Sequence, residues 1–106
     1  MVIAETEFDL SYTADKMMVR LYSPEYQQDG DAWICRFEIG KPLSVSRGIH
    51  GESSLQAIAL ALKAISSNLY GSELYKAGQL GIFGEFGSFL SIPAPAVFLD
   101  IAPYPF

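Results

Sequence analysis

Two side chains that could act as a nucleophile, a base or a metal ligand occur only once each in this chain of 106 residues. They are Cys35 and His50, so a metal site with two histidines from one chain is excluded, and no zinc-ligand spacing is present. A thiol and an imidazole can form a nucleophile–base pair. However, Cys35 shares the alternating phase of Trp33 and Phe37, which predicts a buried, inert thiol, and His50 falls past the end of the predicted strand pairing. We therefore predict no catalytic residue, no metal and no cofactor.

A second set of residues favours a small-ligand site as the alternative. Glycines recur at every third position of the segment 81–87, but no Gly-Lys-Ser/Thr follows, so tight turns explain them better than a phosphate loop does. Arg47 falls in the inward phase of its strand, and Gly48 beside it predicts a β-bulge that turns Arg47 outward. If Arg47 points inward instead, the chain is a ligand-binding protein or small enzyme with a pocket near Arg47, His50 and this glycine-rich segment.

Charged and apolar side chains share the outward face of three predicted strands. Acidic residues dominate the first strand, where Glu5, Glu7 and Asp9 form one row. Apolar side chains within a charged rim are the composition of a protein-binding patch, although a solvated sheet face that binds nothing can carry the same mixture. The predicted binding residues, with one added from the fourth strand, are Glu7, Asp9, Met18, Arg20, Tyr22, Ile34, Arg36 and Arg47.

Composition limits the class of partner. The net charge is −5 and the seven basic residues are scattered, which argues against nucleic acid because phosphate binding needs clustered Lys and Arg. The N-terminus carries acids where a secretion signal would be apolar, and no apolar run reaches the roughly 18 residues of a membrane span. We expect a cytoplasmic protein of one domain (1–106), with no membrane partner. The expected partner is a protein that is basic where it meets the acidic row, or a second copy of the chain in a homodimer.

Alternation of apolar and polar residues predicts four strands, over residues 7–12, 17–22, 33–39 and 43–49. Polar or glycine-containing connections separate them, so we predict an antiparallel meander in sequence order. Matching of the apolar faces places Asp9 opposite Arg20, and Cys35 opposite Arg47. Short strands are predicted after residue 78, at an edge of the sheet because prolines keep strands there. The apolar C-terminal end, up to Phe106, is expected to dock on the body of the protein or on a second chain.

One long helix is predicted over Ser54–Tyr70. Ser53 and Gln56 form an S-x-x-Q capping box, and Gly71 ends the helix. Leucine and isoleucine recur at helical spacing and alanines widen the stripe, which predicts a broad face buried against the sheet. The predicted fold class is α+β, a four-stranded antiparallel meander packed on one long helix, with short C-terminal edge strands. The predicted core residues are Phe8, Leu10, Val19, Leu21, Trp33, Cys35, Phe37, Leu43, Val45, Ile58, Leu62, Ile65 and Leu69.

Three short motifs carry a resemblance to a family of small bacterial domains of unknown function. They are Trp33-x-Cys35, the helix start Gly51-x-x-Ser54-Leu55-Gln56-Ala57, and Ile92-Pro93. The resemblance covers roughly residues 31–93 and leaves the first two strands outside. It implies no activity and no functional residue. Because the usual catalytic constellations are missing, the expected function is a non-catalytic protein-binding module, an immunity-like or accessory protein. The immunity-like role is an analogy with small acidic domains that act beside bacterial toxins.

Overall fold

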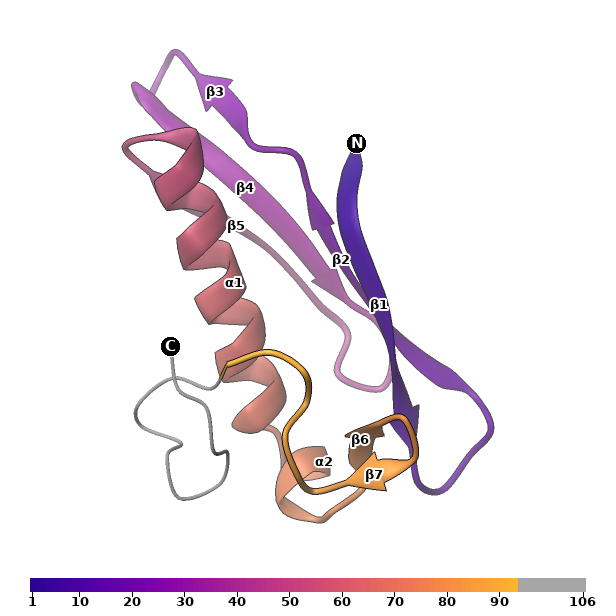
Figure 1. Ribbon diagram of the computed structural model, residues 1–106. Coiled ribbons are helices and arrows are strands. Elements are labelled where there is room, and N and C mark those ends of the chain that lie inside the picture. The colour runs from indigo at the N-terminus through magenta and orange to yellow at the C-terminus, as the bar shows by residue number, and fades with distance from the viewer. Residues whose placement is uncertain (94–106) are drawn as a thin grey trace.

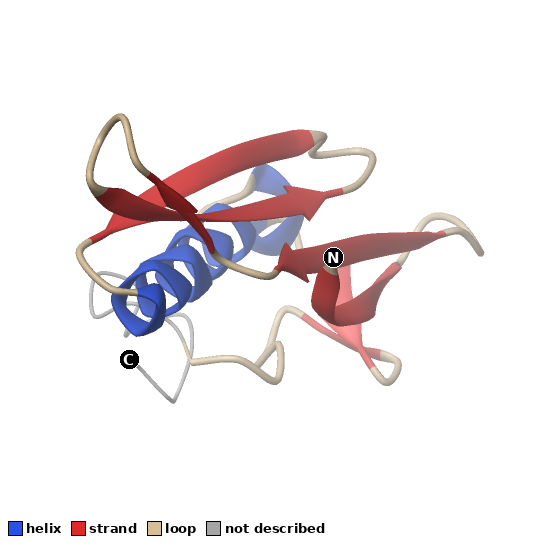
Figure 2. Ribbon diagram, turned by 90° about the horizontal axis from the view of Figure 1, so that it is seen from above, coloured by secondary structure: helices blue, strands red, loops and turns tan. Residues whose placement is uncertain are grey.

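The protein is an α+β fold in which one main helix lies across one face of an antiparallel sheet. The computed structural model describes residues 1–93. Seen from above, the helix lies beneath the sheet and no described element covers the opposite face (Figure 1, Figure 2). In chain order the elements are β1 (Val2–Leu10), β2 (Lys16–Tyr22), β3 (Glu25–Gln27), β4 (Ala32–Ile39), β5 (Val45–Gly51), α1 (Ser54–Tyr70), α2 (Glu73–Lys76), β6 (Leu80–Ile82) and β7 (Glu85–Phe86).

The four long strands pair antiparallel in chain order, β1 with β2, β2 with β4 and β4 with β5. The predicted meander is therefore roughly matched. The structure adds β3, which lies within the connection predicted as a loop and shares one edge of β4 with β2. It also adds the β6–β7 hairpin, which extends the sheet beyond β1 in the place expected for short edge strands. The expected strand run and docked end after residue 93 lie outside the described residues.

The register of the first hairpin differs from the predicted one. Asp9 faces Lys16, and Arg20 faces Glu5, so the predicted pairing of Asp9 with Arg20 is wrong. The cause is the length of the turn. The strand β1 ends at Leu10, where its carbonyl accepts a hydrogen bond from the Thr13 amide, so the chain reverses earlier than the apolar pattern indicated.

The second hairpin is also shifted. Ser44 has a φ of 52° and donates its amide to the Gly40 carbonyl (3.0 Å), which makes the connection two residues longer than predicted. Arg47 therefore faces Phe37, and the predicted pairing of Cys35 with Arg47 is wrong. The ladder runs without interruption from Val45 to Gly51, so the predicted bulge at Gly48 is wrong as well. Arg47 stays in the inward phase and is exposed because β5 is an edge strand.

The N-terminus of α1 has the predicted cap. Ser53 Oγ accepts a hydrogen bond from the Gln56 amide (3.0 Å), and Gln56 Oε1 accepts one from the Glu52 amide (2.6 Å). The helix begins very close to the end of β5, since a Cβ atom on Gly51 would lie 2.5 Å from the Ala57 nitrogen. Only small residues on both elements permit such an approach.

This close approach decides which helix residues form the core. Ala57 and Ala61 are fully buried, together with Ile65 and Leu69 along the same face. Leu62 was predicted to be a core residue, and this prediction is wrong because Leu62 is 38% exposed. The alanines make the contact with the sheet, so that Leu62 faces β1 and β2. The other predicted core residues are buried or pack against the core, and the buried residues that the prediction missed include Met17, Ile39, Tyr70, Tyr75, Leu80 and Leu90.

After β7 the chain returns beneath the sheet to α1 (Figure 1). We call residues 88–93 the return segment. The Tyr70 hydroxyl accepts a hydrogen bond from the Leu90 amide (2.9 Å) and donates one to the Ile92 carbonyl (2.7 Å). Ser66 Oγ donates to the Pro93 carbonyl (2.5 Å). These bonds hold the return segment against the last turns of the helix.

Candidate functional site

The uncovered face of the sheet brings together seven of the eight predicted binding residues. Cross-strand pairing places Glu7 opposite Met18, and the phase of each strand puts the other members on the same side. The eighth, Arg47, points to the helix side of the sheet, so the structure separates it from the others. We call this uncovered surface the open face, and its predicted members are Glu7, Asp9, Met18, Arg20, Tyr22, Ile34 and Arg36.

Most charges on the open face are paired with one another. Arg20 Nε donates to Glu5 Oε2 (3.0 Å), and the Tyr22 hydroxyl donates to Glu38. Arg36 Nη1 donates to Glu25 Oε2 (3.1 Å). Exposed ion pairs of this kind contribute little to stability. Carboxylates still outnumber cations by five to three, as the face carries Glu5, Glu7, Asp9, Glu25 and Glu38 with Lys16, Arg20 and Arg36.

Ile34 was predicted to be an exposed apolar group on this face, and the structure corrects this. Its side chain is buried because Gly48 opposite Arg36 on the neighbouring strand leaves a space that Ile34 fills. Met18 and Tyr22 remain partly exposed. The apolar part of the open face is therefore smaller than the sequence indicated.

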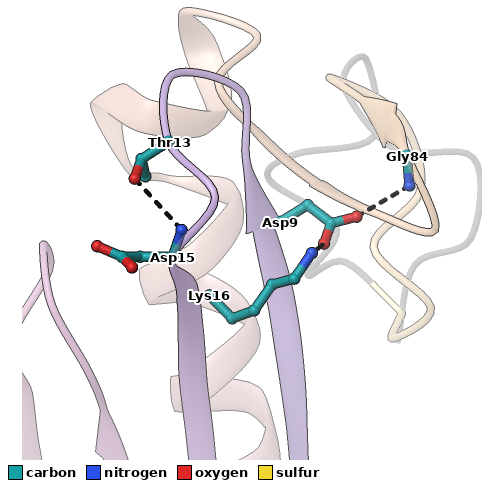
Figure 3. A network of polar contacts seen from close by, with 5 residues as sticks. All are labelled: Asp9, Thr13, Asp15, Lys16 and Gly84. Carbon is teal, nitrogen blue, oxygen red and sulfur yellow. Dashed lines mark hydrogen bonds and ion pairs between the residues drawn. The ribbon is translucent and has the colours of Figure 1, made fainter.

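Asp9 links three elements at one end of the open face (Figure 3). Its carboxylate accepts hydrogen bonds from Lys16 Nζ (2.5 Å) on β2 and from the Gly84 amide (2.9 Å) in the β6–β7 turn. The Lys16 ammonium and then the Gly84 amide lower the pKa of Asp9, and Asp9 in turn raises the pKa of Lys16. Asp9 therefore holds the β6–β7 turn against β1.

Cys35 and His50 do not form a reactive pair. The Cys35 thiol is buried, donates to the Tyr22 carbonyl (3.3 Å), and has its pKa raised by burial. His50 faces Ile34 in the ladder, so it is paired rather than past the end of the strand, and it lies on the face opposite to Cys35. A thiol that is protonated and shielded is a poor nucleophile.

The predicted pocket near Arg47, His50 and the glycine-rich segment is not formed by these residues. Arg47 and His50 point to opposite faces of β5, at one edge of the sheet. The glycine-rich segment forms the β6–β7 hairpin beyond β1, at the other edge. Its glycines serve the hairpin, since Gly84 and Gly87 have φ values of 78° and 71°. Within residues 1–93 no group of three histidine, cysteine or acidic side chains could hold a metal ion.

Three hollows lie elsewhere on the described residues 1–93, and no pattern in the sequence indicated them. An apolar groove of about 220 Å³ lies between β1–β2 and α1, lined by Phe8, Leu62 and Ile92 among others. A hollow of about 550 Å³ lies beside Glu7, Asp9 and the β6–β7 turn. The largest, about 780 Å³, lies where the β4–β5 turn meets the end of α1 and α2. The apolar groove was not expected because Leu62, which lines it, had been assigned to the core.

The sequence of this chain matches a known family of domains. A family model described as a domain of unknown function, DUF6968, matches residues 4–93. The chain belongs to this family. The match confirms the predicted resemblance and extends it to β1 and β2, which the resemblance had left outside. No curated protein and no solved structure matches the chain significantly. In the described part of this DUF6968 domain, no helix is both long and apolar enough to cross a membrane.

Proposed function

We propose that this DUF6968 domain is a non-catalytic protein-binding module, an immunity-like or accessory protein, and that the open face is its binding surface. The observation that carries the proposal is the grouping of six solvent-accessible predicted binding residues on one uncovered sheet face, with Ile34 buried among them. The excess of carboxylates on that face favours a partner that is basic where it docks. Partly exposed Met18 and Tyr22 supply apolar area among the charges.

The paired state of these charges supports recognition more than affinity. Arg20, Arg36 and Tyr22 are held in place by their neighbours before any partner arrives. Because these side chains are already ordered, binding of a partner costs little of their conformational entropy. Electrostatic complementarity of this kind raises the association rate, and salt screens it.

The test is site-specific photo-crosslinking in the native cell. A photoreactive amino acid replaces Met18 on the open face or, as the matched control, Lys63 on the exposed side of α1. We expect a discrete crosslinked protein from Met18 and none from Lys63, and we expect the purified pair to associate more slowly as salt rises. Equal products from both positions, or a product from Lys63 alone, would remove the open face as the binding surface.

A small-ligand role is the second candidate, and the cavity of about 780 Å³ favours it. This volume falls within the roughly 300–1,000 Å³ of ligand sites. Its lining includes Tyr12, Asn68 and Glu73. A bound ligand should raise the melting temperature, and Tyr12→Ala should abolish that shift. Ligand-induced shifts that are unchanged by Tyr12→Ala would place the ligand elsewhere.

A further inference from the structure

One edge of β1 carries backbone groups with no strand of residues 1–93 beside them over most of its length. The other edge pairs with β2 along the strand, whereas β6 pairs with β1 only at Asp9 and Leu10. Within residues 1–93, the stretch from Val2 to Phe8 therefore has a free edge. A free strand edge is a template for pairing with another chain.

Two hydrogen bonds show which backbone groups point to this free edge. Ser11 donates its amide to the Gln79 carbonyl beyond β1, and alternation along a strand puts Glu7 and Glu5 in the same phase. A second hydrogen bond gives the same result. The Met18 carbonyl accepts a hydrogen bond from the Gly40 amide, so the backbone groups of Met18 point toward β4 and do not bond to Glu7, which lies opposite Met18 on β1. The N–H and C=O groups of Glu5 and Glu7 thus point away from β2.

The helix side of this edge is apolar. The groove of about 220 Å³ is lined by Ala4 and Phe8 from β1, Leu62 and Ile65 from α1, and Ile92 from the return segment. It is smaller than the roughly 300–1,000 Å³ of ligand pockets. A groove of this size beside a free edge fits the alternate side chains of an extended strand better than a separate small molecule.

The other side of the same edge is acidic. Glu5 and Glu7 project there, and the hollow of about 550 Å³ lies between Glu7, Asp9 and the β6–β7 turn. Phe83 at the tip of that turn is 85% exposed. Asp9 is already bound to Lys16 and Glu5 to Arg20, whereas Glu7 forms no ion pair within residues 1–93. Cationic side chains that emerge on this side would meet the carboxylate of Glu7.

We propose that the free edge of β1 accepts an extended strand of a protein partner, and that apolar residues alternate with lysine or arginine in that strand. The alternation of a strand sends one set of side chains into the apolar groove and the other set toward Glu5 and Glu7. The proposal rests on the protein-binding function and adds a second surface and a sequence pattern for the partner. A second copy of the chain fits poorly, because pairing β1 with β1 brings the glutamates of both copies together.

The probe is an acetylated and amidated peptide of alternating valine and lysine, about seven residues long, within the usual length of a strand. It is titrated into the full chain and followed by amide resonances. We expect the largest shifts at Glu5 and Glu7, and binding that weakens as salt rises. A peptide of alternating valine and glutamate is the charge control and should not bind.

Two variants at one position separate backbone pairing from charge. Glu7→Pro removes the amide that points to the free edge and leaves the bonds between β1 and β2 in place. Glu7→Ala removes the carboxylate and keeps the amide. We expect Glu7→Pro to weaken peptide binding at least about tenfold, which is one 1.4 kcal/mol step, and Glu7→Ala to weaken it less. Amide spectra of both variants check that the fold is retained.

Equal binding by the wild type and Glu7→Pro overturns the proposal. So does an absence of peptide binding with slow hydrogen exchange at Glu5 and Glu7, because the edge is then already covered. If hydrogen exchange at Glu5 and Glu7 slows as the protein concentration rises, the edge is covered by a second copy of the chain. If the exchange rate does not depend on concentration, the edge is covered by residues 94–106 of the same chain. If the wild type forms the Met18 crosslink with its native partner while the peptide result overturns the proposal, the open-face function stands and only the β1 inference fails.

Discussion

The side chain of Ile34 on β4 lies over Gly48 on β5, diagonally across the ladder. A Cβ atom added to Gly48 would lie 2.6 Å from Ile34 Cδ1 and 3.1 Å from its Cγ1. Because Gly48 has no side chain, Ile34 can pack against its backbone and is buried, although this face of the sheet is otherwise open to solvent. This contact between a large residue and a glycine on neighbouring strands removes the apolar side chain of Ile34 from the solvent-exposed surface of the open face.

Gly48→Ala tests the contact between Ile34 and Gly48. The new methyl group forces Ile34 out of its rotamer, at a cost of about 0.5–1.5 kcal/mol, while alanine is favoured over glycine in a strand by about 0.5–1 kcal/mol. We expect a small net change in the wild type and a stabilisation in the Ile34→Val background, which lacks Cδ1. Urea unfolding of the four proteins measures the coupling. Free energies that add within about 0.3 kcal/mol would show that the two residues are independent.

Leu69→Ala should lower the free energy of unfolding by about 2–5 kcal/mol, because Leu69 is fully buried between the helix and the sheet. Leu55→Ala on the same helix is the matched control. Leu55 is 75% exposed, so its truncation should change stability by less than about 0.5 kcal/mol. Urea unfolding curves provide both values. Similar losses in the two variants would mean that the buried face of α1 is assigned wrongly.

The elements of this fold were largely predictable because local signals specify them. The Ser53–Gln56 cap and the glycine at position 71 marked the ends of α1, and apolar alternation marked the four long strands. The register was not predictable, because it depends on turn geometry, such as the left-handed Ser44, that alternation does not encode. The buried face of α1 was predicted correctly at Ile65 and Leu69 and wrongly at Leu62, since the alanines that touch the sheet carry a weaker hydrophobic signal than Leu62.

Tyr70→Phe should loosen the return segment. The variant removes the hydroxyl that accepts from the Leu90 amide and donates to the Ile92 carbonyl, and leaves the buried amide unsatisfied. We expect a loss of about 1–3 kcal/mol in the free energy of unfolding. Hydrogen exchange at the Leu90 amide should become faster. Tyr12→Phe, at an exposed tyrosine, controls for the loss of a phenol. An unchanged exchange rate at Leu90 in Tyr70→Phe would contradict the role of this contact.

The Asp9 carboxylate should make the β6–β7 turn sensitive to acid. Its pKa lies below the ordinary value of 3.8, because Lys16 and the Gly84 amide favour the charged form. A lowered pKa in the folded state stabilises the protein above the ordinary pKa, and the stabilisation is lost as pH falls through the lowered value. The wild type should therefore be more stable than Asp9→Asn at neutral pH, and the difference should shrink in acid. A carboxyl pKa of Asp9 at or above 3.8 by NMR titration would contradict this linkage.

The candidate site was predictable only in outline. Strand alternation placed Glu7, Met18 and Arg20 on one face. This placement survived the register errors because both were shifts by an even number of residues, which leave the phase of each strand unchanged. The ion pairs depend on register and were missed, as the partner of Arg20 is Glu5 rather than Asp9. A meander in chain order already leaves β1 at an edge, but the short stretch of that edge that β6 covers was not predictable, because no local pattern tells which strand the C-terminal hairpin will pair with.

The order of strand pairing also bears on how the chain folds. Each of the contacts β1–β2, β2–β4, β4–β5 and β5–α1 joins elements that are close in sequence, and such contacts form quickly because little loop entropy opposes them. The β6–β7 hairpin is different, because the bond from Gly84 to Asp9 spans 75 residues. The meander and its helix are therefore expected to assemble first. The edge of β1 next to Asp9 remains uncovered until this last, long-range contact forms.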